Sequence, residues 1–236
     1  MQARAERERD SAKHQVVARS HKEMPREIAY NWLDRTASGL SAEEAMFVVR
    51  LQANEDAAYD ELVRTYSASM FHVAYRMLGD NAEASDIVQE IFLKVFRNIG
   101  GFKGEAALKT WIFRIAFSEI LNRLRWWKRR HRSSTVSLDD QPNGNGTGPG
   151  YSLASSTPTP EQALQSKEQE AAIQQALGRL SREHRSIIVL RDIEGFSYNE
   201  IAEVLGVSIG TVKSRLARAR SDLKKSLMCY LSVRSL

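Results

Sequence analysis

The sequence predicts an all-α protein with two small helical domains joined by a flexible linker. Apolar residues recur at three- and four-residue steps in several long segments, which is typical of amphipathic helices. No segment shows the strict alternation expected of a half-buried strand. Between the helical halves, residues 133–160 hold four of the five prolines and no lysine or arginine. That composition indicates a linker without a core of its own.

The first predicted domain covers residues 41–132 and contains amphipathic helices. Ser41 and Glu44 form a Ser-x-x-Glu capping pattern at its start. Glycines follow two of the helical segments, and a third helix is predicted from Thr110 to about Trp127. The apolar stripes are Tyr59, Leu62, Val63, Tyr66, Met70, Val73, Ala74 and Met77, then Ala84, Ile87, Val88, Ile91, Phe92, Val95 and Ile99, and finally Trp111, Ile112, Ile115, Ala116, Ile120 and Leu124.

The second predicted domain covers residues 161–236, and residues 1–40 are interpreted as a flexible, charge-mixed extension. The charged N-terminus lacks the apolar core of a signal peptide, and no apolar run approaches the roughly 20 residues of a spanning helix. Cys229 is the one cysteine in 236 residues, so no internal disulfide can form. We therefore expect a cytoplasmic protein without membrane insertion.

Residues 197–220 have the pattern of a helix-turn-helix. Ser197 and Glu200 form a capping box before a short helix, Tyr198 to Leu205. Gly206 permits a tight turn, and Ser208 can cap a second helix that begins at Ile209. Small and apolar residues at Ala202 and Val212 let the two helices cross closely.

The second helix of this motif is strongly basic on its exposed side. Between residues 208 and 225 there are six lysines and arginines against one acid, Asp222. Short polar side chains can reach base edges while arginines hold phosphates. The alternative is a basic, solvated helix in a helical bundle. The predicted contacts to duplex DNA are Ser208, Thr211, Lys213, Ser214, Arg215, Arg218 and Arg220.

A second basic tract lies at residues 122–132, with six lysines or arginines, no acid, and Trp126 and Trp127 inside it. Cations can follow phosphates while an indole stacks on an unpaired base. The alternatives are that one or both tryptophans belong to the core and that the charges are solvated or in part compensate a helix dipole. The net charge of +5 is consistent with an anionic partner.

Motifs for cofactor or metal chemistry are absent from the sequence. There is no Gly-x-x-x-x-Gly-Lys loop, no dinucleotide fingerprint, and no His-Glu-x-x-His set among the five scattered histidines. We expect no catalytic residue, no cofactor and no metal site.

Two motif blocks resemble the sigma-70 family of RNA polymerase sigma factors. The first is Ala82-Glu83-Ala84-Ser85-Asp86-Ile87-Val88-Gln89-Glu90-Ile91-Phe92-Leu93-Lys94-Val95-Phe96, continued by Phe102-x-Gly104 and Thr110–Ala116. The second runs from Leu180 through Arg191–Ala202 to Gly210–Arg220. The first block resembles region 2 and the second resembles region 4. Only a linker lies between the two blocks, and in this the sequence resembles the extracytoplasmic-function (ECF) subgroup.

The resemblance implies a promoter-specificity subunit that reads the −10 element with the first domain and the −35 element with the second. It implies docking of the first domain on the β′ clamp helices of core polymerase through Asp86, Gln89, Glu90, Leu93 and Phe96. The loop from Gly100 to Lys109 matches the part that traps a flipped −10 base. The implied −10 contacts are Lys103, Lys109, Trp111, Arg114, Ser118, Asn122, Arg123, Arg125, Trp126, Lys128, Arg129 and Arg130.

Further partners implied by the resemblance are the β flap of polymerase, single-stranded −10 DNA, duplex −35 DNA and an anti-sigma factor. Ser118, Asn122 and the Trp126–Trp127 pair depart from the usual family pattern, so the resemblance implies no particular −10 sequence. Two other classes of protein remain as alternatives. One is a helix-turn-helix repressor or activator that binds duplex DNA alone, and the other is a regulatory adaptor that uses only its first domain.

Overall fold

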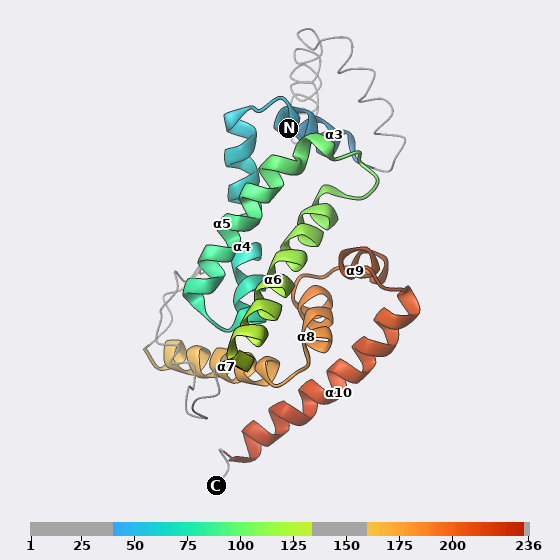
Figure 1. Cartoon of the computed structure of the whole chain (residues 1–236). Helices are drawn as coiled ribbons and strands as arrows, with labels where there is room; N and C mark the ends of the chain where they lie inside the picture. The colour runs from blue at the N-terminus through green and yellow to red at the C-terminus, as the bar shows by residue number, and fades with distance from the viewer. Residues whose placement is uncertain (1–39, 134–159, 234–236) are drawn as a thin grey trace, which may run out of the picture. The chain divides into compact units, whose positions relative to one another are not determined.

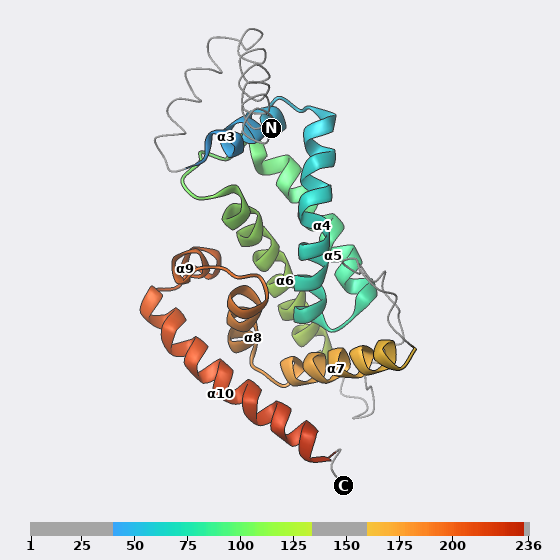
Figure 2. The same cartoon turned by 180° about the vertical axis from the view of Figure 1, so that it is seen from behind.

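The computed structural model describes residues 40–133 and 160–233, in the helices labelled α3 to α10 in Figure 1. The predicted extension 1–40 and linker 133–160 lie almost entirely outside the described residues. Within the described ranges every regular element is helical, which confirms the predicted all-α class. The chain divides into two compact units: Met1–Ala58 with Ile99–Leu108, and Tyr59–Asn98 with Lys109–Leu236. Figure 2 shows the helices from behind.

The described part of the first unit is built on helix α3 (Ala42–Gln52) and the turn η1 (Ile99–Gly101). Ser41 caps α3, because its side chain accepts a hydrogen bond from the backbone of Glu44. The buried side chains of this unit are Leu40, Ala45, Val48, Leu51, Ala58, Ile99, Phe102 and Leu108. They hold the segment 99–108 against α3, although about 50 residues separate the two along the chain.

The second unit contains three long helices of the first motif block: α4 (Asp56–Leu78), α5 (Asn81–Asn98) and α6 (Leu108–Ser133), of which α4 and α6 begin in the first unit. Their apolar stripes form a core in which Ile91, Ile112 and Ile120 have no exposed surface. Gly79 has a φ of +81°, a left-handed conformation that ends α4 as predicted. Helix α6 continues beyond the predicted end at Trp127, because no glycine or proline interrupts residues 108–133.

The same unit contains α7 (Pro160–Gly178), α8 (Arg182–Ile188), the π-helical turn η2 (Val189–Ile193), α9 (Tyr198–Leu205) and α10 (Ile209–Val233). Ser181 caps α8, because its side chain accepts a hydrogen bond from the backbone N–H of His184. Helices α8, α9 and α10 pack around Ile187, Leu190, Ile201, Val212 and Leu216, all buried. Among the described residues no helix is long and apolar enough to cross a membrane.

Candidate functional site

The helix-turn-helix has the predicted geometry. The side chain of Ser197 accepts from the backbone N–H of Glu200, and the Glu200 carboxylate accepts from the backbone N–H of Ser197 at 2.8 Å. Burial alone would raise the pKa of the Glu200 carboxyl, but these hydrogen bonds and the charge of Lys109 hold it below the usual value. Gly206 has a φ of +63°, and Val212 is fully buried, so the turn and the second helix are locked together.

The exposed side of α10 presents Lys213, Ser214 and Arg218 to solvent. Other predicted contacts are already engaged within the chain. Ser208 caps the helix by accepting from the N–H of Thr211, and the two hydroxyl oxygens lie 2.9 Å apart. Arg220 forms a two-pronged ion pair with Asp192, with 3.1 Å between Nε and Oδ2. This pairing was not foreseen, because Asp192 lies 28 residues away along the chain.

One face of α6 carries half of the predicted −10 contacts. Arg114, Ser118, Asn122 and Trp126 follow one another at four-residue steps, which places them in a stripe along the helix, and all four are exposed. Arg125 and Arg129 extend this stripe, and the guanidinium of Arg130 lies 4.9 Å from the ring centroid of Trp126. Trp126 is 43% exposed, whereas Trp127 is half-buried. Trp126 is therefore not a core residue, and this alternative interpretation of the basic tract is wrong for Trp126.

Arg123 lies on a different side of α6. Its Nη1 donates to Glu83, and its Nη2 lies 2.7 Å from Oε1 of Glu90, both on α5. Burial lowers the pKa of the Arg123 guanidinium, but hydrogen bonds and charges of the two carboxylates outweigh this and raise it. The expected DNA contact Arg123 and the expected polymerase contact Glu90 are thus partners of each other.

The loop between η1 and α6 is anchored from α3 at both ends. The side-chain amide of Gln52 donates to the carbonyl oxygens of Ile99 at 2.8 Å and Phe102 at 3.1 Å. At the other end, the carboxylate of Glu44 accepts from the backbone N–H of Leu108 at 2.6 Å. Lys103, a predicted DNA contact, is exposed between these anchors. No local sequence signal marks the role of Gln52, because its partners lie 47 and 50 residues away.

Comparisons with known proteins decide the family. Residues 62–131 match sigma-70 region 2, and residues 170–223 match sigma-70 region 4. The RNA polymerase sigma-H factor of Pseudomonas aeruginosa is 35% identical over 80% of this chain and 96% of its own length. The ECF sigma factor SigW of Bacillus subtilis is 33% identical over 76% and 94%. The chain belongs to the ECF sigma factors of the sigma-70 family.

A solved relative agrees with this assignment. The sigma factor RpoE of Bartonella quintana, crystallised with the anti-sigma factor NepR, superposes with a TM-score of 0.53 and 25% identity, covering 72% of this chain and 96% of that chain. In sigma factors, region 2 reads the −10 promoter element and region 4 reads the −35 element. This sigma factor therefore directs RNA polymerase to promoters, and the predicted family and function are confirmed.

Lys109 is held by the segment that precedes the helix-turn-helix. Its ammonium lies 3.3 Å from the carbonyl oxygen of Glu194 and 4.5 Å from the ring centroid of Phe196. The rings of Phe113 and Phe196 pack at 4.7 Å between centroids, and both residues are buried. In this conformation Lys109 is occupied by protein rather than open to DNA.

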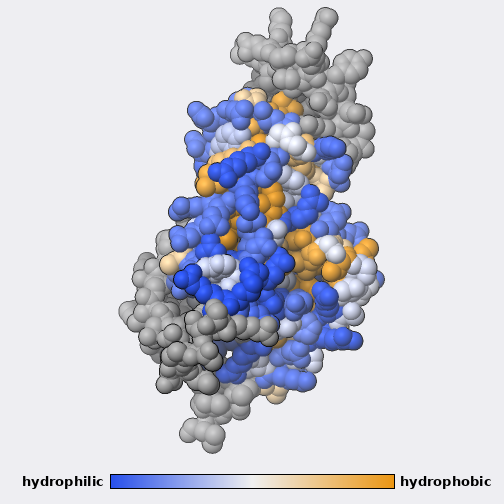
Figure 3. Space-filling model, viewed as in Figure 1, coloured by the Kyte–Doolittle hydropathy of each residue, from blue (hydrophilic) through white to orange (hydrophobic). Residues whose placement is uncertain are grey.

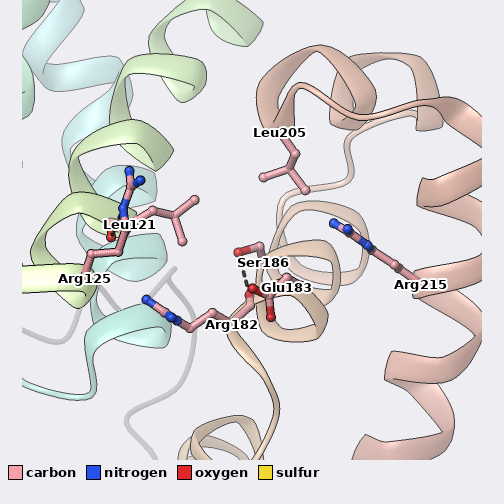
Figure 4. Close-up of a pocket in the computed structure, with 7 residues that line it drawn as sticks. All are labelled: Leu121, Arg125, Arg182, Glu183, Ser186, Leu205 and Arg215. Carbon is pink, nitrogen blue, oxygen red and sulfur yellow. Dashed lines mark hydrogen bonds between the residues drawn. The ribbon is translucent and has the colours of Figure 1, made fainter. Parts of the chain in front are cut away.

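Two other predicted DNA contacts line one cavity of about 300 Å³. Figure 4 shows Arg125 on α6 and Arg215 on α10 on opposite sides of it, with Arg182 and Glu183 of α8 between them. Leu121, Ser186 and Leu205 complete the lining. Three guanidinium groups face one carboxylate here, so the cavity wall is positive. In the described residues, no group of three or more His, Cys, Asp and Glu could hold a metal ion.

The anchoring of the loop by Gln52 yields a first prediction. Gln52→Ala removes two hydrogen bonds that fix the loop, so we expect promoter opening to fall about tenfold while −35 duplex binding is retained. A fluorescent base placed in the −10 element of a promoter fragment reports the opening by holoenzyme. Glu43→Gln, an exposed change on the same helix, is the control. Equal opening by both variants would contradict the anchoring role.

Proposed function

We propose that this sigma factor reads promoters through two separate surfaces, the exposed stripe of α6 and the exposed side of α10. The α6 stripe, observed as an exposed run of polar, basic and aromatic side chains on one helix face, carries the proposal. The −10 domain, which carries the α6 stripe, is then residues 41–132, and the −35 domain, which carries α10, is residues 161–236.

The α6 stripe combines the two chemistries that single-stranded DNA requires. Arg114, Arg125 and Arg129 supply cations for the phosphates, while Ser118 and Asn122 supply hydrogen-bonding groups for base edges. Trp126 offers an exposed indole, and stacking of a base on such a ring contributes about 1–3 kcal/mol. Much of the face in Figure 3 is hydrophilic, with apolar surface between the polar areas.

The α10 surface is suited to the major groove of duplex −35 DNA. Lys213, Ser214 and Arg218 project from the first three turns of the second helix, where the recognition helix of this motif meets the bases and phosphates. Thr211 and Arg215 lie beside them. Ser208 contributes through the cap that fixes the start of the helix, and Arg220 through its ion pair with Asp192.

The α5 face is proposed to dock on the β′ clamp helices of core polymerase. Asp86, Gln89 and Glu90 are exposed there, and Leu93 is 50% exposed although it is apolar. Phe96 is half-buried, with its ring 4.6 Å from that of Tyr59, and it supports the face from below. Acidic groups around an exposed leucine are typical of a polar rim around an apolar contact.

An apolar patch beside α9 is proposed as a second protein contact. In Figure 3 it is seen as orange surface over α9, and Ile193 and Ile209, which flank α9 in the sequence, are each 43% exposed. Exposed apolar groups of this kind often mark interaction sites. We assign the patch to the β flap of polymerase, since docking there would fix the second domain at the −35 position.

Each domain alone is a weak DNA binder in this account, and polymerase holds both at a fixed separation. The effective concentration of one domain then rises once the other is bound. The chain contributes no chemistry of its own and acts in the cytoplasm beside polymerase. The Bartonella relative was crystallised with an anti-sigma factor, and we propose that such a factor also controls this chain.

Run-off transcription tests the polymerase-docking assignment. Purified core enzyme with the full chain is expected to produce discrete transcripts from a genomic library, and core enzyme alone is not. Asp86→Lys reverses a charge on the α5 face and should abolish both the transcripts and core binding. Normal transcripts from Asp86→Lys would refute the docking face, while no transcripts from the unaltered chain would refute the function itself.

Arg218→Ala tests the −35 surface. Loss of one phosphate contact should weaken promoter binding by holoenzyme and reduce the slope of log affinity against log salt by about 0.9. Arg179→Ala is the matched control, because Arg179 is also an exposed arginine but precedes α8 and lies outside α10. Identical salt slopes for the two variants would remove Arg218 from the DNA surface.

A further inference from the structure

The direction of Arg123 on α6 follows from helical geometry. An α-helix has about 3.6 residues per turn, so the nine residues from Arg114 to Arg123 make about two and a half turns. Arg123 therefore points to the opposite side of the helix from Arg114. It shares that side with Glu119, four residues before it. Around the helix Arg123 also lies about 100° from Asn122 and about 60° from Trp126, so its side chain lies outside the stripe.

The Arg123 side of α6 runs along α5, and ion pairs join the two helices. Glu119 lies 2.6 Å from the ammonium of Lys94, and Arg123 contacts the carboxylates of Glu83 and Glu90. Arg123 keeps only 21% of its side-chain surface exposed. A DNA phosphate would have to displace two carboxylates to reach this guanidinium.

Glu90 stands where the edge that faces α6 meets the proposed docking face of α5. Asp86 precedes it by four residues and Leu93 follows it by three, so all three are neighbours on the helix surface. Its side chain is 49% exposed, which leaves part of the carboxylate open to a partner while Arg123 holds the other part. A carboxylate fixed in this way loses little side-chain entropy when it docks.

We propose that Arg123 is a positioning residue for the polymerase-docking face and not a DNA-reading residue, an inference that rests on the proposed docking role of α5. It holds Glu90 in one orientation at the border of that face. The basic tract therefore has two roles. Arg123 supports polymerase binding through α5, and the residues of the tract in the α6 stripe contact promoter DNA.

The test measures core binding and DNA binding separately in the full chain. Arg123→Gln should weaken affinity for core polymerase about three- to tenfold, because Glu90 is then no longer held in one orientation before it docks. At core concentrations that saturate every variant, its holoenzyme should bind −10 single-stranded DNA with an unchanged salt slope. Arg129→Gln, on the DNA stripe, should instead reduce that slope by about 0.7.

Glu119→Gln is the matched control for a merely structural role. It breaks the ion pair of Glu119 with Lys94, which also joins α5 and α6, and Lys94 is not among the residues of the docking face. We expect it to lower the melting temperature as Arg123→Gln does while leaving core affinity unchanged. Arg123→Lys should restore part of the core affinity, because an ammonium can still reach a carboxylate.

Two results would overturn the proposal. One is a reduced salt slope for Arg123→Gln with core affinity intact, which would make Arg123 a DNA contact. The other is an equal loss of core affinity in Glu119→Gln. That result would mean that Arg123 only stabilises the packing of α5 against α6. If Arg123→Gln does not fold, Glu83→Gln carries the test and should give a smaller loss of core affinity. If the unaltered chain fails to bind core polymerase, that result contradicts the proposed function and not the role of Arg123.

Discussion

The burial of one apolar face of α6 is the constraint on which this protein's two working surfaces depend. Ile112, Phe113, Ala116, Phe117 and Ile120 have essentially no exposed surface. Once that face is fixed in the core, the helical repeat sets the direction of every polar side chain on α6. The polar positions outside that face divide between the exposed stripe and the side of Glu119 and Arg123, which meets α5. A substitution in the buried face would therefore disturb both surfaces together.

Local signals explain why the helix-turn-helix could be predicted residue by residue. Its start depends on a capping box four residues long, and its turn depends on Gly206 in a left-handed conformation. Both are encoded by neighbours in the sequence, so no tertiary information is needed. Family resemblance added the roles of the two domains, which spacing alone would have left as general DNA binding.

Contacts between residues far apart along the chain could not be predicted from the sequence, because they depend on the tertiary fold. Gln52 anchors a loop about 50 residues away, and Asp192 binds Arg220 across 28 residues. Nothing in the adjacent sequence marks such partners. A count of charges over residues 122–132 predicts a single nucleic-acid surface that includes Arg123. The structure separates it, because residues that are adjacent in sequence point about 100° apart on a helix.

The division of α6 and α5 into a DNA surface and a polymerase surface is the central claim, and site-specific photo-crosslinking tests it directly. A photoreactive group is attached at Ser118→Cys or at Gln89→Cys, each in a full chain with Cys229 replaced by serine, and the holoenzyme is bound to promoter DNA. We predict that position 118 crosslinks to the −10 strand and position 89 to the β′ subunit. Crosslinks of position 118 to polymerase alone, or of position 89 to DNA, would contradict the account.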